Sequence, residues 1–207
     1  PFSLKKWGKG QADNDPYGRY PYGTPPKDAG DLAFIQHMIA SLKSDGSMGV
    51  VVPHGVLFRG SSEKEIRKGI LEDDLLEAVI GLPSALFYGT GIPAALLIIN
   101  KNKPSDRKGK VLFINGELEY QEGKNQNKLR DEDINRIIET FDGYEDEKRY
   151  AKVISKSIAD LSPFCIAFSI PETIVSVVAF FLDLNNSEKP SVLSKCNLVI
   201  FLILIFY

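Results

Sequence analysis

The stretch LLEAVIGLPSALFYGTGIPAALLIINK, residues 75–101, constrains the fold more than any other part of the chain. It holds two apolar runs without polar alternation, at 76–82 and 94–100, which predict strands covered on both faces of an α/β sheet. The glycine-rich loop between them carries two adjacent aromatic residues, Phe87 and Tyr88. Glycine permits positive φ and the close approach of another molecule. The loop is therefore either a platform that stacks on a flat ligand or a tight connection with Phe87 in the core.

Composition narrows the class of protein without deciding it. The 207 residues carry a net charge of −2, with 43% hydrophobic and 25% charged residues, which argues against a chain that binds polyanions over its whole surface. The two cysteines, Cys165 and Cys196, match no metal-ligand spacing. We expect no metal site and no disulfide framework. No signal peptide is visible, so we expect a reducing, cytoplasmic location.

Residues 1–30 are rich in Gly, Pro, Tyr and Asp without periodicity, which predicts a long loop. Five positive charges against three negative ones give this segment a charge of +2, and aromatic residues lie between them. Such a segment could follow a nucleic-acid backbone, or it could be an ordinary solvated loop. The candidate DNA-backbone contacts are Lys5, Lys6, Lys9 and Arg19.

From residue 31 onward the periodicity predicts helix, strand, helix, three strands and helix, at 31–44, 48–53, 62–71, 76–82, 94–100, 111–114 and 130–141. Asp28 or Asp31 can cap the first helix, and Gly46 can end it in the left-handed conformation. Ser62 with Glu65 predicts a capping box on the second helix. This order predicts the second half of a doubly wound sheet, parallel with an antiparallel final hairpin. His37 and His54 are each expected to be structural.

The last helix, at 130–141, is expected to turn Ile134, Ile137 and Ile138 inward and to begin with acidic residues in its first turn. Residues 156–207 then change character, with few charges and many Phe, Ile and Leu. One interpretation is a membrane anchor, but Pro171 and Glu172 interrupt the first apolar run and the last run of 12 residues is short for a span. The favoured interpretation is a frameshifted or disordered tail with no membrane role.

Several motifs together resemble the modification (DNA methyltransferase) subunit of type I restriction-modification systems. They are the Pro1-Phe2 start, the Lys/Trp/Gly-rich loop, DLAFIQHMIASLKSDGSMGVVVPHGVLFRGSSEKEIRKGILE and the stretch 75–101. The resemblance covers about residues 1–155 and implies a Rossmann-like sheet that uses S-adenosylmethionine. In the family the catalytic loop is Asn-Pro-Pro-Phe, so Pro1 would be its second proline and Phe2 its aromatic. The Asn, the first proline and the upstream half with the glycine-rich cofactor motif are absent.

The resemblance also implies a mechanism and a set of partners. The target adenine is flipped out of the duplex, and its amine is polarised by the Asn side chain and the first proline's carbonyl. Phe2 would stack on the base, with Phe87 as the second aromatic contact and Tyr88, Gly89 and Thr90 beside it. The implied partners are DNA, the specificity and restriction subunits and a second modification subunit.

We therefore expect a C-terminal fragment of an adenine-specific DNA methyltransferase that is inactive alone. Its expected parts are a catalytic, DNA-facing loop (1–30), the C-terminal half of the catalytic domain (31–115), an extension (116–155) and the tail (156–207). A stand-alone adenine methyltransferase and a non-catalytic, membrane-tethered interaction remnant are the alternatives.

Overall fold

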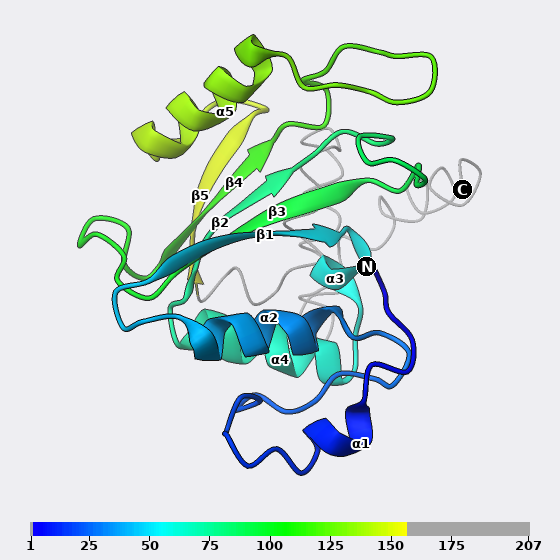
Figure 1. Ribbon diagram of the computed structural model, residues 1–207. Coiled ribbons are helices and arrows are strands. Elements are labelled where there is room, and N and C mark those ends of the chain that lie inside the picture. Colours follow the sequence, from blue (N-terminus) through cyan, green and yellow to red (C-terminus); the bar gives the residue numbers. More distant parts are fainter. Residues whose placement is uncertain (1, 157–207) are drawn as a thin grey trace, which may run out of the picture.

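The computed structural model describes residues 2–156, which form one mixed sheet with helices on both faces (Figure 1). Ten elements follow one another along the chain: α1 Lys9–Ala12, α2 Asp31–Ser41, β1 Ser47–Pro53, α3 Gly55–Phe58, α4 Ser62–Glu72, β2 Leu76–Gly81, β3 Ala94–Asn100, β4 Lys110–Asn115, α5 Asp131–Gly143 and β5 Ala151–Ser155. The seven predicted elements are all present. The structure adds α1, α3 and β5, and the apolar tail lies outside the described residues.

The strand order is β1-β3-β2-β4-β5, and it corrects the predicted parallel sheet. The β2–β3 hairpin is antiparallel as expected, but β3 lies between β1 and β2 and is antiparallel to both. Among the hydrogen-bonded neighbours of this sheet, β2 and β4 form the one parallel pair, and β5 adds a further antiparallel pair with β4. The physical reason is the connection 82–93, which contains no helix to serve as a parallel crossover, so β3 must return antiparallel.

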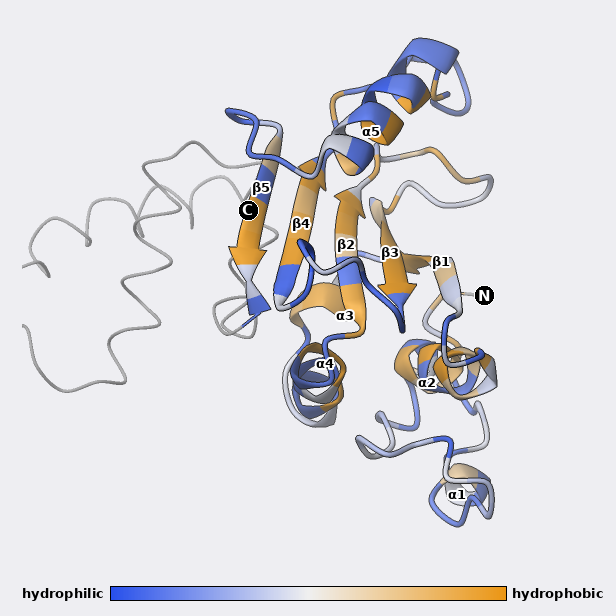
Figure 2. Cartoon of the chain, turned by 90° about the vertical axis from the view of Figure 1, so that its left-hand side faces the viewer, coloured by the Kyte–Doolittle hydropathy of each residue, from blue (hydrophilic) through white to orange (hydrophobic). Residues whose placement is uncertain are grey.

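Alternating residues of the strands build two separate apolar layers. Helices α2 and α4 cover one face of the sheet, whereas α5 lies over the other (Figures 1 and 2). Val79 and Leu97 point to the first layer, and Ala78 and Ile80 point to the second. The prediction that β2 is covered on both faces is thus confirmed. On β3 the second face is only half-buried, at Leu96 and Ile98.

The predicted helix caps are wrong. Helix α2 begins at Asp31, but Gly30 is its N-cap, and the Asp31 carboxylate instead accepts hydrogen bonds from Ser3 and Arg59. The helix ends at Ser41 with an extended C-cap residue, so Gly46 plays no left-handed role. On α4, Ser61 occupies the N-cap position and no side chain caps the helix.

Helix α5 has the predicted acidic first turn, but its apolar side is only partly buried. Ile134 and Ile138 are 40% and 49% exposed, and only Ile137 of the predicted trio packs against the core. The reason is that α5 meets the sheet through Ile137 and Phe141, together with Tyr144 just beyond its C-terminus. Ile134 and Ile138 therefore lie on the side of the helix outside this contact.

Candidate functional site

Three strands, β1, β2 and β4, run in the same direction, so their carboxyl ends lie at one edge of the sheet. Backbone hydrogen bonds connect the segments that lie beside these strand ends. The backbone N–H of His54 donates to the Pro93 carbonyl across 3.2 Å, and the N–H of Gly116 donates to the Gly81 carbonyl across 3.0 Å. This edge of an α/β sheet is where ligands usually bind.

The ring of Phe87, on the loop after β2, meets the ring of Phe2 at this edge. The ring centroids are 5.9 Å apart and the planes cross at 87°, an edge-to-face contact. Phe2 is 36% exposed, whereas Phe87 is half-buried and packs against the second apolar layer. The two interpretations of Phe87, platform and core residue, are therefore compatible, because its ring both joins the core and contacts Phe2.

Tyr88 points the other way and is 94% exposed. The chain reverses directly after it, since Gly89 has φ of +77° and the N–H of Thr90 donates to the Phe87 carbonyl across 3.4 Å. Of the predicted base-contacting residues the structure thus brings Phe2 and Phe87 together. Tyr88 and Gly89 are exposed at the tip of the same loop, and Thr90 beside them is half-buried. Pro1 lies outside the described residues.

Gln126 and Asn127 hold the loop that carries Phe87 through hydrogen bonds to its backbone, and we call this set of contacts the Asn127 clamp. The sequence did not predict it. The backbone N–H of Asn127 donates to the Ala85 carbonyl and its side chain donates to the Ser84 carbonyl, each across 2.9 Å. The Gln126 side chain donates to the Leu86 carbonyl. Ala85 has φ of +51°, a conformation that such outside contacts must maintain. Segment 121–128 is polar and aperiodic, so no local sequence pattern predicts that it supports the Phe87 loop.

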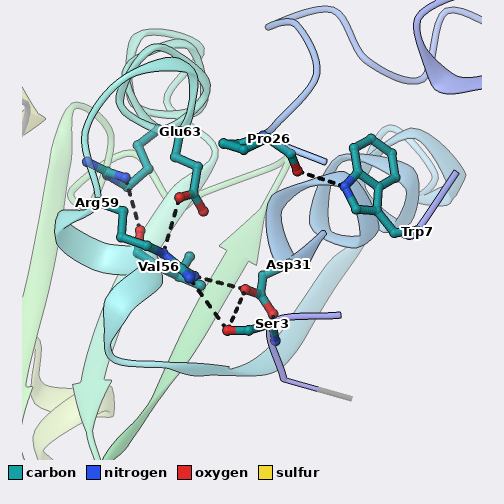
Figure 3. Close-up of polar contacts among 8 residues, drawn as sticks. Ser3, Trp7, Pro26, Asp31, Val56, Arg59 and Glu63 are labelled. Carbon is teal, nitrogen blue, oxygen red and sulfur yellow. Dashed lines mark hydrogen bonds and ion pairs between the residues drawn. The ribbon is translucent and has the colours of Figure 1, made fainter. Parts of the chain in front are cut away.

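The N-terminal loop is attached to the body at several points. The Ser3 N–H donates to Asp31 Oδ1 across 2.7 Å, and the indole N–H of Trp7 donates to the Pro26 carbonyl across 2.8 Å (Figure 3). Further along, the Tyr22 ring covers Gly69 of α4, where an added Cβ would sit 2.2 Å from a ring carbon. The Tyr22 hydroxyl donates to Asp73 across 2.5 Å, and burial raises the pKa of this tyrosine.

Behind Ser3, Arg59 bridges two buried carboxylates (Figure 3). Its Nη2 donates to Asp31 Oδ2 across 2.9 Å, and its Nε lies 3.1 Å from Glu63 Oε2 without forming a hydrogen bond. Glu63 is 2% exposed, and its Oε1 has no hydrogen-bond partner within residues 2–156. Burial raises the pKa of Glu63.

The four predicted DNA-backbone residues differ in their pairing. Lys9 lies 2.7 Å from Asp13, and Arg19 pairs with Asp15 through both its backbone and its guanidinium. Hydrogen bonds from Lys9 and Arg19 lower the pKa of Asp13 and Asp15 respectively. Lys5 and Lys6 are exposed and form no ion pair within the described part of the chain. Lys27 and Asp28, adjacent in sequence, are exposed as well and offset each other, so the net +2 of the loop comes from Lys5 and Lys6.

Each of the two histidines lies close to one charged side chain. His37 lies 3.4 Å from Arg19 on the outer surface of α2, and His54 Nε2 lies 3.4 Å from Glu117 Oε1 at the sheet edge. Residues 2–156 contain no group of three or more His, Cys, Asp or Glu side chains arranged to hold a metal ion. Over the same residues, none of the helices has the length and apolar character needed to cross a membrane.

Comparison with known proteins identifies the family. Residues 1–161 match the sequence model of the N-6 DNA Methylase family. The chain belongs to this family. Among relatives, it is 43% identical over 135 residues to the methylase subunit of the type I restriction enzyme MjaVII from Methanocaldococcus jannaschii, covering 64% of this chain and 23% of that protein. It is 36% identical over 159 residues to the HindI methylase subunit from Haemophilus influenzae, covering 73% and 35%.

The N-6 DNA Methylase fold is also seen in a solved relative. The crystal structure of a type I restriction-modification methyltransferase subunit from Streptococcus thermophilus superposes with a TM-score of 0.68 at 37% identity, covering 75% of this chain and 33% of that one. The resemblance to type I modification subunits is therefore confirmed. The chain spans between about a quarter and about a third of the length of these relatives.

Proposed function

We propose that this chain provides the surface that holds a flipped adenine in an N6-adenine DNA methyltransferase of the type I restriction-modification kind. The observation that carries the proposal is the Phe2–Phe87 ring contact, because it lies at the edge of the sheet where ligands of α/β proteins usually bind, in a chain of this family. A base inside a duplex is out of reach of any active site, so the adenine must leave the stack and be held elsewhere.

The energies of the competing contacts support this role. An aromatic pair contributes about 0.5–1.5 kcal/mol beyond its buried area. Stacking of a base on an aromatic side chain contributes about 1–3 kcal/mol. A flipped adenine can therefore replace the edge-to-face contact at little or no net cost. Phe87 is held by the core and by the Asn127 clamp, so the more exposed Phe2 is the ring that moves to admit the base.

S-adenosylmethionine is the methyl donor expected for this family, and it would supply the sulfonium methyl group to the adenine amine. We assign no residue of this chain to the donor, because the resemblance places its glycine-rich motif outside residues 1–207. Phe2 and Phe87 act on the base alone: they hold its flat faces, orient the amine and exclude water from it. No metal is needed for this chemistry.

The proposal places the chain in a larger assembly in the cytoplasm. The relatives named above are subunits of type I restriction enzymes, which supports partners of that kind. These partners are DNA, a specificity subunit that reads the sequence, a restriction subunit and a second modification subunit. Inactivity of the chain on its own is part of the same proposal, and a transfer assay with labelled S-adenosylmethionine measures it directly.

The test compares two DNA duplexes that differ only in the target base. One carries a single mismatched adenine, which costs little to unstack, and the other has an abasic site at that position. We expect the wild-type chain to bind the adenine duplex at least about fivefold more tightly, as one stacked base provides. Phe87→Ala should abolish this preference, while the neighbouring Tyr88→Ala should retain it. Equal binding of both duplexes by the wild type would overturn the proposal.

A further inference from the structure

We propose that Arg59 is a positioning residue for Phe2, acting through Asp31 and Ser3. The inference rests on the proposed role of Phe2 in holding the base. It identifies a cation that touches neither ring but fixes the direction in which the chain presents one of them (Figure 3).

Ser3, the residue directly after Phe2, has an unusual backbone conformation. Its φ is +50°, a left-handed conformation that a non-glycine residue adopts only when its surroundings enforce it. The enforcing group is the Asp31 carboxylate, which accepts the Ser3 N–H across 2.7 Å and lies 3.4 Å from the Ser3 hydroxyl. The orientation of this carboxylate therefore sets the direction of the chain at Phe2.

The Asp31 carboxylate is in turn oriented by Arg59. Asp31 is 7% exposed, and its Oδ2 accepts a hydrogen bond from Arg59 Nη2 across 2.9 Å. Arg59 also lies within 3.5 Å of the Ser3 hydroxyl through Nη1. A guanidinium presents its donors in a rigid plane, so it can fix the carboxylate and the hydroxyl together. An ammonium in the same place provides charge without this geometry.

Arg59 also faces a second carboxylate, that of Glu63. Glu63, in the first turn of α4, is buried and lies 3.1 Å from Arg59 Nε. Removal of Arg59 would leave the buried Asp31 carboxylate without its cation, and uncompensated buried charge is strongly unfavourable, whereas Glu63 would keep the charge of Arg67 nearby. The Asp31 carboxylate would then turn toward water or other donors and release Ser3.

The role of Arg59 is distinct from the general attachment of the N-terminal loop. The rest of the loop has its own anchors: Lys6 N–H donates to the Lys27 carbonyl, Gly30 N–H donates to the Leu4 carbonyl, and Trp7 is held by Pro26. Loss of Arg59 should therefore change the direction of residues 2 and 3 while the segment around Trp7 stays in place. A purely structural cation would loosen all of these parts together.

The experiment uses fluorine NMR on the full chain with 4-fluorophenylalanine introduced at position 2. In the wild type the Phe87 ring should shift the fluorine resonance, and Phe87→Leu defines the resonance without that ring. Arg59→Ala should move the signal to the Phe87→Leu position. Arg136→Ala is the matched control, because Arg136 also pairs with two carboxylates, those of Glu119 and Glu147, and lies on α5, over the opposite face of the sheet from α2. It should leave the wild-type shift unchanged.

Two further readouts keep the result decisive. Trp7 is the single tryptophan of the chain, so its emission reports whether the loop body and the fold survive in each variant. If Arg59→Ala unfolds the chain, Arg59→Lys decides the question, because it keeps the charge and loses the planar fork. An intermediate fluorine shift in Arg59→Lys supports positioning. A wild-type shift in Arg59→Lys, or in a folded Arg59→Ala chain, overturns it.

The same variants tell failure of this inference from failure of the proposed function. With the adenine and abasic duplexes, Arg59→Ala should reduce the preference for adenine at least threefold, and Arg59→Lys should restore part of it. A wild-type chain that shows the ring shift but no adenine preference would refute the proposed function and leave the role of Arg59 standing. An adenine preference that is unchanged in folded Arg59→Ala would refute the positioning role.

Discussion

The backbone N–H of Asn127 donates to the carbonyl oxygen of Ala85 across 2.9 Å, which joins the segment before α5 to the loop that carries Phe87. The contact holds Ala85 in a left-handed conformation two residues before the aromatic ring. The part of the chain after β4 is therefore structurally coupled to the candidate site, although it contributes no ring to it.

We expect Asn127→Ala to lower the free energy of unfolding by about 1 kcal/mol, the usual contribution of one hydrogen bond, because it removes the bond to the Ser84 carbonyl together with the longer, 3.4 Å bond from the Gly123 N–H. The preference for the adenine duplex should fall as well, since the Phe87 loop loses part of its support. Urea unfolding and duplex binding measure the two effects. The exposed neighbour Asn125 provides the control, and Asn125→Ala should change neither quantity.

The Phe2–Phe87 contact should appear as a coupling energy in the absence of DNA. In a double-mutant cycle with Phe2→Ala and Phe87→Ala, urea unfolding should give about 0.5–1.5 kcal/mol of interaction between the two rings. Phe87→Ala should cost more than Phe2→Ala, because only Phe87 packs against the core. A coupling energy of zero would show that the rings do not interact in solution.

The pairing of the four basic residues predicts which of them contribute to DNA affinity. Lys5→Ala and Lys6→Ala should each weaken binding and reduce the slope of log K against log salt by about 0.9, as for one phosphate contact. Lys9→Ala and Arg19→Ala should have smaller effects on the slope, because their charges are paired with Asp13 and Asp15. Binding titrations at several salt concentrations measure this. Equal slopes for all four variants would contradict it.

The ion pair between Lys103 and Asp74 should control stability at low pH. The Lys103 side chain is 2% exposed and its ammonium donates to Asp74 Oδ1 across 2.8 Å. Burial by itself raises the pKa of Asp74, but the hydrogen bonds from Lys103 and from the Gly109 N–H hold it below the ordinary value of 3.8. The folded state thus binds its proton less readily than the unfolded chain. The resulting stabilisation is present above pH 3.8 and is lost as pH falls through the folded pKa.

Asp74→Asn should therefore destabilise the chain by about 3–5 kcal/mol near neutral pH, since it leaves Lys103 buried without its counter-charge. It should also flatten the acid side of the stability profile. Urea unfolding between pH 2.5 and about pH 7 measures both effects. Asp106→Asn is the control, in the turn that also carries Lys103. The Asp106 side chain is exposed, so this substitution should leave the dependence of stability on pH close to that of the wild type.

Local pattern was sufficient to predict most of the elements. The apolar spacing of Leu32, Ile35 and Ile39 predicted α2, and the unbroken run at 94–100 predicted β3, because each pattern is set by neighbours in the sequence. Strand order could not be predicted in this way. The insertion of β3 between β1 and β2 depends on pairing between distant segments. The short β5, with Lys152 and Ser155 among its five residues, has too little apolar periodicity to be recognised.

The candidate site was likewise predicted only in part. Phe2 and Phe87 were predicted from the family resemblance and the loop composition, and the structure brings their rings into contact. Arg59 and Asn127 were not predicted, because each acts through hydrogen bonds to residues far away in sequence. A single arginine or asparagine in a polar segment has no periodicity that would indicate its partner.

The packing of the Tyr22 ring against Gly69 has a consequence for how tightly the chain can bind DNA. A loop of about thirty residues that became ordered only on contact with DNA would lose conformational entropy at that moment, at about 1–2 kcal/mol for each backbone position fixed. Here the ring of Tyr22 lies against a helix position that has no side chain, and its hydroxyl is bound to Asp73. Folding has already fixed this part of the loop, so less of the binding energy is spent on ordering it and more remains as affinity.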